Sequence, residues 1–478
     1  MKEDLKVVAG YFQGQVTRSL LKEQGRKLKV RLYWRTLTPL VVIWGLVVQR
    51  LSGDHRLGGV VNYLRQGGAD NLDGEDGHKK RLSERLKSES TSGLVQARQR
   101  LPLAMVEEVD RKVQGAMRAE MAAGGETCQW QGLEARLLDG TTYRLKPYAD
   151  LVEAYGRAKN QHGESNWVTV KSVAAFCLYS QCVVGHAEGD EHNSEASLVR
   201  AVMLRDASPH SVYVGDINFG QYRVAQVARA CNKHVLLRLS PGQAKTLLRK
   251  NKLTDRPDDG SSFRVSWDPT GAKNALVTEP DLPCEPIEGR LIYKRLDRPG
   301  FRPIHLYLFT DLLDETQYTV TDLVALYGLR WQVELDYRDI KATLCMAEFD
   351  VQSNDMFKLE LTAGLLSYNL LRALMLKAAR QAGCKPRQLS FISSLRWMVN
   401  HLQLGYPTWV LVQYPNPFDW LIENMAKCRL PVRKNKVAHE PRAVRYRPKP
   451  FPALKTTRAQ ARLDNLAKLG FQAAQPIS

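Results

Sequence analysis

Apolar and polar residues follow patterns that change character several times along the chain. Residues 1–125 and 386–478 carry helical patterns, and the second of these segments ends in a basic tail. Between them, residues 126–239 alternate short apolar runs with helical stretches. Strands that alternate with helices in this way predict an α/β layer built on a mixed sheet.

The predicted layer has two acidic residues where strands end. We predict strands over residues 133–139, 168–185, 211–216 and 234–239, and helices over residues 194–207 and 222–230. The first strand ends on Asp139 and the third ends on Asp216. Strand ends present side chains to clefts, so the two carboxylates are candidates to share a metal ion. A strand-end Asp is also a common turn former, so neither residue decides the question alone.

Residues 240–315 lose the helical alternation and predict a β-rich insertion in the layer. Its short apolar runs, at residues 263–267, 291–296 and 304–309, are separated by Pro, Gly and Asp. Helices resume over residues 316–385, where residues 359–376 are apolar on most faces and predict a buried packing helix. Near the amino terminus, seven glycines over residues 53–77 predict a loop.

Charge narrows the class of partner. The 478 residues include 69 Lys and Arg against 50 Asp and Glu, a net charge of +19 that favours a polyanion such as nucleic acid. Residues 427–468 contribute 13 basic and 2 acidic residues, and they are interrupted by prolines at positions 441, 448, 450 and 452. This pattern predicts an extended arm along DNA phosphates. Its candidate DNA contacts are Arg433, Lys434, Arg445 and Arg447.

An anionic membrane is the other polyanion to consider, and the sequence disfavours it. The longest apolar run, residues 40–48, is about half of the roughly 20 residues that a membrane-spanning helix needs. The amino terminus lacks the pattern of a secretory signal. Eight scattered cysteines without a Cys-x-x-Cys pair indicate reduced thiols, so we expect a cytoplasmic protein without a membrane partner.

Residues 327–341 carry an unusual set of side chains for one helix face. Spacings of 3, 4 and 7 residues place four of them within an arc of roughly 60°: Tyr327, Arg330, Glu334 and Lys341. Asp336 points to the opposite side by the same arithmetic. A carboxylate flanked by Arg and Lys suits a site that binds a metal ion and phosphate. A surface ion pair between Arg330 and Glu334 is the alternative, but it explains neither Tyr327 nor the position of Lys341.

These residues carry a resemblance to a known family. The order and spacing Tyr-(2)-Arg-(3)-Glu-(6)-Lys resemble the signature of bacterial transposases of the family named for insertion sequence four. In this chain the four positions are Tyr327, Arg330, Glu334 and Lys341. Residues 137–141, Leu-Leu-Asp-Gly-Thr, resemble its first acidic motif. Residues 216–220, Asp-Ile-Asn-Phe-Gly, followed by a strand that bears Arg238, resemble its second. The resemblance covers about residues 130–345.

The resemblance implies a fold and a reaction. The fold is a ribonuclease-H-like mixed sheet with helices, interrupted by the β insertion and flanked by a helical DNA-binding region and a helical, basic carboxyl-terminal region. The reaction is cut-and-paste DNA transposition, with Asp139, Asp216 and Glu334 as the catalytic, metal-binding triad. Two Mg²⁺ ions, replaceable by Mn²⁺, would activate a water or a 3′-hydroxyl and stabilise the leaving oxygen.

The resemblance also implies partners and phosphate contacts. Residues 1–125 would bind the inverted-repeat ends of the element, and a homodimer would join two ends to double-stranded target DNA in the bacterial nucleoid. Phosphates near the cut would be bound by Arg330, Lys341 and Tyr327, and Arg238 is a weaker candidate for the same role. Within the insertion, relatives carry a tryptophan that stacks on a base flipped during hairpin formation, where this chain has Leu306. The stacking candidates that remain are Tyr307, Trp267 and Trp331.

Two other functions compete with an active transposase. One is a metal-dependent nuclease of the same fold without strand joining. The other is a non-catalytic DNA-binding protein derived from a transposase. Three convergent carboxylates argue against the second, because a pure binding protein has no use for them.

Overall fold

A single mixed sheet forms the centre of the molecule. The computed structural model describes residues 12–53, 55–70, 72, 80–123, 125–160, 163–190, 192–254, 256–269, 279, 281–297 and 303–431, together with residues 456–468. The strands lie in the order β5-β4-β1-β6-β7-β10-β9-β8, with β11 beside β1. Their bounds are β1 (Glu134–Leu145), β4 (Val168–Cys177), β5 (Val183–Gly189), β6 (Ser211–Gly215), β7 (His234–Leu239), β8 (Ser262–Trp267), β9 (Ile287–Leu296), β10 (Ile304–Thr310) and β11 (Glu348–Phe349). Strands β2 (Lys159–Asn160) and β3 (Gly163–Glu164) form a separate hairpin.

Pairing in the sheet matches the predicted mixed, ribonuclease-H-like class. Strand β4 is antiparallel to both of its neighbours, β5 and β1, whereas β6 and β7 run parallel to β1. Helix α9 packs on β4 and β5, and α10 packs on β7. The predicted helix over residues 222–230 and strand over residues 234–239 are confirmed at their bounds.

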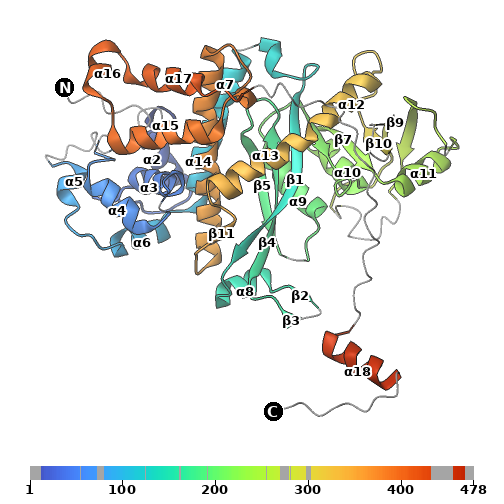
Figure 1. The fold of residues 1–478 in the computed structure, drawn as a ribbon, viewed down its shortest axis with the longest axis horizontal. Helices are drawn as coiled ribbons and strands as arrows, with labels where there is room; N and C mark the ends of the chain where they lie inside the picture. Colours follow the sequence, from blue (N-terminus) through green and yellow to red (C-terminus); the bar gives the residue numbers. More distant parts are fainter. Residues whose placement is uncertain are drawn as a thin grey trace.

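Helices surround the sheet and gather at one end of the molecule. Figure 1 shows α2–α6 and α15–α17 together at one end, with β8–β10, α10 and α11 at the other. Their bounds are α2 (Arg18–Lys27), α3 (Pro39–Leu51), α4 (Leu57–Arg65), α5 (Leu82–Arg85), α6 (Ser92–Gln99), α7 (Leu103–Ala122), α8 (Ala149–Tyr155), α9 (Glu195–Arg205), α10 (Tyr222–Ala230), α11 (Pro241–Lys250), α12 (Val320–Gly328), α13 (Gln332–Arg338), α14 (Asn354–Gln381), α15 (Phe391–Leu404), α16 (Thr408–Gln413), α17 (Pro417–Lys427) and α18 (Arg458–Lys468).

Helix α14 is the central packing helix that the sequence predicts. It is apolar on most faces and buried over most of its length, and α3, α7 and α17 pack against it. Glu360 of α14 forms buried ion pairs with Arg50 of α3, at 3.2 Å, and with Arg98 of α6. The amino-terminal helices are therefore joined to the rest of the chain through a shared core. Helix α3 contains the longest apolar run and is buried throughout, and no helix among the described residues has the length and apolar character to cross a bilayer.

Two predicted strand boundaries are wrong. Strand β1 does not end at Asp139 but continues to Leu145, because β4 pairs with it along this whole stretch. The single strand predicted over residues 168–185 is two antiparallel strands, β4 and β5. The turn between them includes Gln181, which adopts a left-handed conformation (φ 65°) and donates its N–H to the Cys177 carbonyl.

Three other segments differ from the prediction. Residues 240–315 contain α11 as well as strands, and their strands continue the main sheet through the antiparallel pair β7–β10. The predicted loop over residues 53–77 includes α4, whose burial of Val60, Val61 and Leu64 outweighs two helix-weakening glycines. Within the basic tail, α18 is helical rather than extended.

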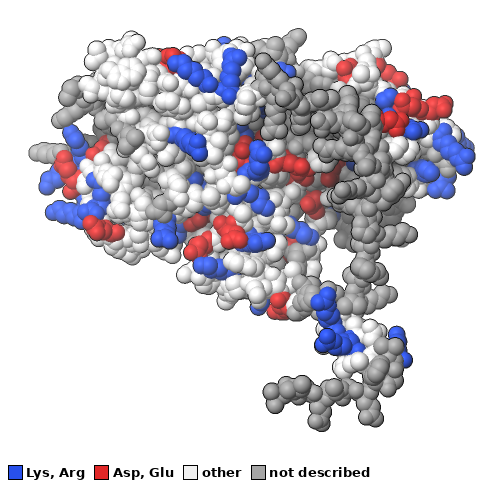
Figure 2. Space-filling view, viewed as in Figure 1, with Lys and Arg blue, Asp and Glu red and all other residues white. Residues whose placement is uncertain are grey.

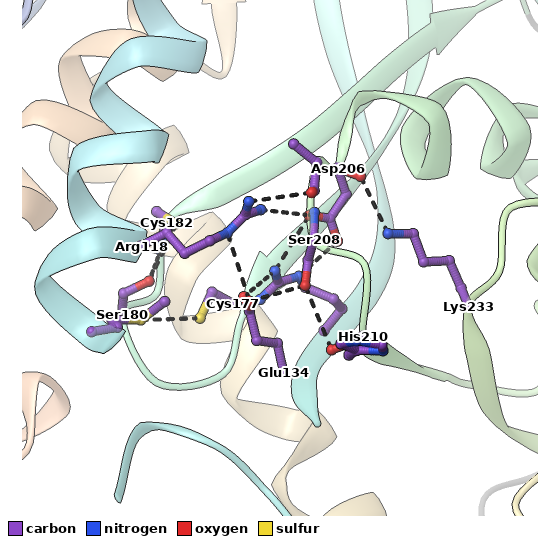
Figure 3. A network of polar contacts seen from close by, with 12 residues as sticks. Arg118, Glu134, Cys177, Ser180, Cys182, Asp206, Ser208, His210 and Lys233 are labelled. Atoms are coloured by element: carbon purple, nitrogen blue, oxygen red, sulfur yellow. Dashed lines mark hydrogen bonds and ion pairs between the residues drawn. The ribbon is translucent and has the colours of Figure 1, made fainter. Parts of the chain in front are cut away.

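A buried ionic network fixes the amino-terminal ends of β1 and β6 (Figure 3). Arg136 of β1, fully buried, donates from Nε to Asp206 Oδ2 at 2.9 Å, and its guanidinium also pairs with Glu134. The Ser208 N–H donates to Asp206 Oδ1 at 3.0 Å, and Lys233 donates to the Asp206 carbonyl. Because buried charges are tolerated only when they are paired, this network specifies the register at one end of the parallel strands. Both predicted catalytic Asp residues lie toward the opposite end.

Candidate active site

Asp139 and Asp216 lie side by side where β6 stops pairing with β1. The last residues in register are Leu137 and Val214, and each Asp is two residues further along its chain. Asp216 follows β6 directly, whereas Asp139 remains in β1, which β4 supports from its other side. Parallel strands present such positions on the same face, so the two carboxylates approach each other. The structure thus brings together the two Asp residues that the sequence singled out, although the sequence misplaced the end of β1.

Burial dominates the electrostatics of Asp139. It raises the pKa of this carboxyl to about 6, while the Gly140 N–H (3.0 Å from Oδ1) and the guanidinium of Arg330 oppose the rise. The carboxylates of Asp216 and Glu195 add to the rise, which places both within electrostatic range of Asp139. The site is therefore rich in negative charge in the free protein.

The segment that bears Glu334 is not the single regular helix that the spacing predicts. After α12 the chain tightens into a 3-10 turn at Leu329–Trp331, continues as α13, and widens into a π-helical turn at Asp339–Thr343. Buried ion pairs fix this path, because Arg372 of α14 holds both Asp336 (3.5 Å) and Asp339 (2.8 Å). As predicted, Asp336 points away from the site, and it is fully buried.

Helix α13 lies against β1 beside Asp139, and Figure 1 shows it crossing in front of the sheet. The Tyr337 hydroxyl donates to the Asp139 carbonyl at 2.9 Å. Glu334 is one helical turn earlier than Tyr337, on the same side of α13. Its side chain is 52% exposed, and Oε1 lies 3.9 Å from the Arg330 guanidinium. Glu334 is therefore at the rim of the site rather than in contact with Asp139.

Tyr327 lies close to Arg238, Arg330 and Asp216, and Arg330 is also close to Asp139. Burial raises the pKa of Tyr327, while Arg238 and Arg330 oppose the rise and Asp216 adds to it. Arg330 is only 7% exposed, and its Nε has no hydrogen-bond partner among the described residues. A buried, unsatisfied guanidinium nitrogen is costly and indicates room for an acceptor. A phosphate oxygen suits that position.

Lys341 lies further along β1. Its Nζ donates to Thr141 Oγ1 at 3.1 Å and to the Thr142 carbonyl at 2.9 Å. Burial and the nearby Arg144 lower its pKa. The π-helical turn thus still directs Lys341 to the face of β1, two residues beyond Asp139.

The aromatic candidates differ in exposure. Trp331 is 62% exposed, and the Arg330 guanidinium lies 4.8 Å from the centre of its ring. Tyr307 is buried against Tyr293 in β9, so the surface contact with DNA predicted for it does not fit the structure. Trp267 is half-buried beside Phe309. Leu306 is buried, so the position where relatives carry a tryptophan faces the core.

Arg433, Lys434, Arg445 and Arg447 lie outside the described residues. Elsewhere, Figure 2 shows acidic side chains over α13 and the neighbouring part of β1, with Lys and Arg around them and at both ends of this face. This face therefore combines acids at the centre with dispersed bases.

Two polar neighbours of the acids were missed from the sequence. Asn218 donates its backbone N–H to Asp216 Oδ1 at 2.9 Å and its side chain to Glu195 Oε2 at 3.3 Å. Glu195 is the first residue of α9 and lies 56 residues from Asp139. Only its place after the helix cap Ser194 is visible in the sequence, and that place indicates capping rather than chemistry. Among the described residues, no three His, Cys, Asp or Glu side chains converge closely enough to hold a metal ion as they stand.

Two sequence comparisons identify this chain with one class of protein. Residues 130–370 match the family model of the transposase DDE domain. The chain is 26% identical over 371 residues to transposase InsG for insertion sequence element IS4 of Escherichia coli (strain K12), across 76% of this chain and 78% of that protein. The cryo-EM structure of the piggyBac transposase synaptic complex with hairpin DNA covers 89% of this chain and 86% of its own, at 10% identity and a TM-score of 0.41, which is too distant to inform the fold.

Proposed function

Since this chain belongs to the family of transposases with a DDE domain, we propose that Asp139, Asp216 and Glu334 form its catalytic triad. The observation that carries the proposal is the proximity of Asp139 and Asp216 just beyond the end of the β1–β6 ladder, beside the helix that bears Glu334. A change of the Glu334 rotamer, away from Arg330, would bring the third carboxylate toward the other two. Its exposure leaves it free to make that change.

Membership of this family implies a divalent metal, and the site fits one. Carboxylate oxygens are the ligands that Mg²⁺ and Mn²⁺ prefer, and the three acids lack an ion-pair partner closer than the 3.9 Å from Glu334 to Arg330 among the described residues. We propose that the triad holds two Mg²⁺ ions, replaceable by Mn²⁺. When bound, such ions activate the attacking oxygen and neutralise charge on the leaving one.

The cationic and aromatic residues around the triad are proposed to bind DNA. The unsatisfied Nε–H of Arg330 would donate to a phosphate oxygen, and Tyr327 and Arg238 would extend that contact. Lys341 would bind a phosphate on the β1 side. Trp331 is the best exposed ring for stacking on a flipped base in a hairpin step.

The wider activity follows from the same premise. We propose that the chain nicks the inverted-repeat ends of its element, passes through a DNA hairpin and joins the freed 3′ ends to double-stranded target DNA as a homodimer. The amino-terminal helices and the basic tail would hold the ends, because 11 of the net +19 charges lie in residues 427–468. The similarity to a transposase of insertion sequence element IS4 supports an element-specific role.

Substitution of the acids tests this proposal. Asp139→Asn, Asp216→Asn and Glu334→Gln should each reduce Mg²⁺-dependent cleavage of an element end by at least about 1,000-fold, while the affinity for the uncut end changes less than about threefold. The matched control is Asp355→Asn, an exposed acid in the first turn of α14, which should cleave like the wild type. Cleavage that survives a substitution removes that residue from the triad. Cleavage without joining of ends to a target plasmid would identify a nuclease instead.

A further inference from the structure

Glu195 is an acidic residue in the candidate site that the triad does not include. It opens α9, where an acid ordinarily serves the helix dipole. The Ser194 side chain already caps this helix by accepting from the Ser197 N–H at 3.2 Å. The Glu195 carboxylate instead extends across to β1, toward Asp139.

Gly140 makes room for this carboxylate. A Cβ atom at position 140 would lie 2.1 Å from Glu195 Oε1, so no residue other than glycine fits there while Glu195 keeps its place. The φ angle of Gly140 lies outside the left-handed region, so the backbone itself does not require glycine. The glycine that follows Asp139 is thus explained by Glu195.

Asn218 connects Glu195 to the second Asp. Its side chain donates to Glu195 Oε2, and its backbone N–H donates to Asp216 Oδ1. Glu195 therefore borders Asp139 through Gly140 and Asp216 through Asn218. The guanidinium of Arg330, near Asp139, and the ammonium of Lys171, near Glu195, offset only part of the repulsion among these three carboxylates.

We propose that Glu195 is a further ligand of the divalent cation held by Asp139 and Asp216. This inference rests on the proposed function, which makes those two residues metal ligands. Rotation of the Glu195 and Asp216 side chains would bring their oxygens to one cation. A hard divalent cation accepts such oxygen donors and relieves the repulsion among them.

Mn²⁺ binding to the full chain without DNA tests this inference independently of cleavage. Titration followed by the electron paramagnetic resonance signal of free Mn²⁺ should show Glu195→Gln binding at least about 10-fold more weakly than the wild type. Asp139→Asn should weaken binding at least as much. Asp355→Asn, another acid in a first helical turn, should bind Mn²⁺ like the wild type.

A second variant moves the carboxylate without removing it. Gly140→Ala should displace Glu195 and weaken Mn²⁺ binding to a similar extent. In a Glu195→Ala background, Gly140→Ala should cause no further loss, because nothing remains to displace. Circular dichroism of each variant checks the fold.

The outcomes separate the two proposals. If Asp139→Asn weakens Mn²⁺ binding and Glu195→Gln does not, Glu195 serves only its helix and this inference is overturned while the triad stands. If neither substitution changes Mn²⁺ binding, the metal site of the proposed function fails together with this inference. Additive losses from Gly140→Ala and Glu195→Ala would also overturn it.

Discussion

Lys341 donates hydrogen bonds to Thr141 and Thr142, so its ammonium group is held against β1 in the free protein. The same group is a proposed phosphate ligand. Holding β1 requires the acceptors on Thr141 and Thr142. Binding a phosphate requires only the positive charge of Lys341 near the cut.

Lys341→Met should therefore slow strand cleavage and joining by about 10- to 100-fold, the value of a charge-assisted hydrogen bond of about 1.5–3 kcal/mol. Single-turnover assays on an end with a prepared nick would measure the effect at the joining stage. The control is Thr141→Val, which removes the Oγ1 acceptor but keeps the cation. Equal slowing by both substitutions would show that Lys341 acts by holding β1.

Residues differ in how far the sequence alone could place them. Asp139, Asp216 and Arg330 belong to local motifs, so the sequence indicated them. Glu195 does not belong to such a motif, because its role depends on a contact with Gly140, which lies 55 residues earlier in the chain. The burial of Tyr307 also depends on its neighbours, since both faces of β10 are covered from Leu306 onward and alternation along the strand does not show this.

At the scale of elements, α7 and α14 pack around a buried carboxyl. Asp110 of α7 accepts from Asn369 Nδ2 of α14 at 2.9 Å and from Gln114 Nε2 at 2.8 Å. Burial raises its pKa to about 6, and the two hydrogen bonds only partly oppose this. An unfolded Asp titrates near 3.9.

Between about pH 4 and 6 the folded chain holds a proton at Asp110 that the unfolded chain has released. Stability therefore falls as pH rises through this window, by on the order of 3 kcal/mol for this group. Asp110→Asn should remove this loss of stability, because Asn does not ionise. The free energy of unfolding of the variant minus that of the wild type should therefore be larger at pH 7 than at pH 4. Urea unfolding of both proteins at pH 4 and pH 7 measures these free energies. The contributions of other titrating groups cancel when the wild-type value is subtracted from that of the variant. A difference independent of pH would show that Asp110 is ionised in the fold.

Elements were predictable where local pattern and tertiary context agree. The bounds of α10 and β7 follow from strong apolar patterns and short connections. Strand β1 was cut short because Asp139-Gly140 has the composition of a turn, yet β4 holds it extended by pairing. The π-helical turn after α13 depends on Arg372 of α14, which no local pattern contains.

At the scale of the whole molecule, positive charge is concentrated near the carboxyl terminus. Deleting residues 432–478 removes 11 of the 13 basic residues counted over residues 427–468. If the tail lies along phosphates, each lost contact lowers the slope of log Kobs against log [salt] by about 1. Fluorescence anisotropy on an end duplex between 50 and 300 mM KCl would measure that slope.

The matched control for this deletion is a chain of full length in which the same basic residues are replaced by Gln. Both variants should lose the same salt dependence, since charge rather than chain length carries the effect. An unchanged slope in either variant would place the tail away from the DNA.

The dependence of α3 on α14 has a consequence for synthesis of the protein. Helix α3 ends at Leu51, and its packing partner α14 begins at Asn354, about 300 residues later. At roughly 5–20 residues per second, translation needs about 15–60 s to cover that distance. Throughout this interval the nascent chain carries an apolar helix that can pack against α2, α4 and α6 but not against α14, which has not yet been made. Premature termination before residue 354 leaves that helix without its partner, so truncated products tend toward aggregation or chaperone capture rather than competition for DNA ends.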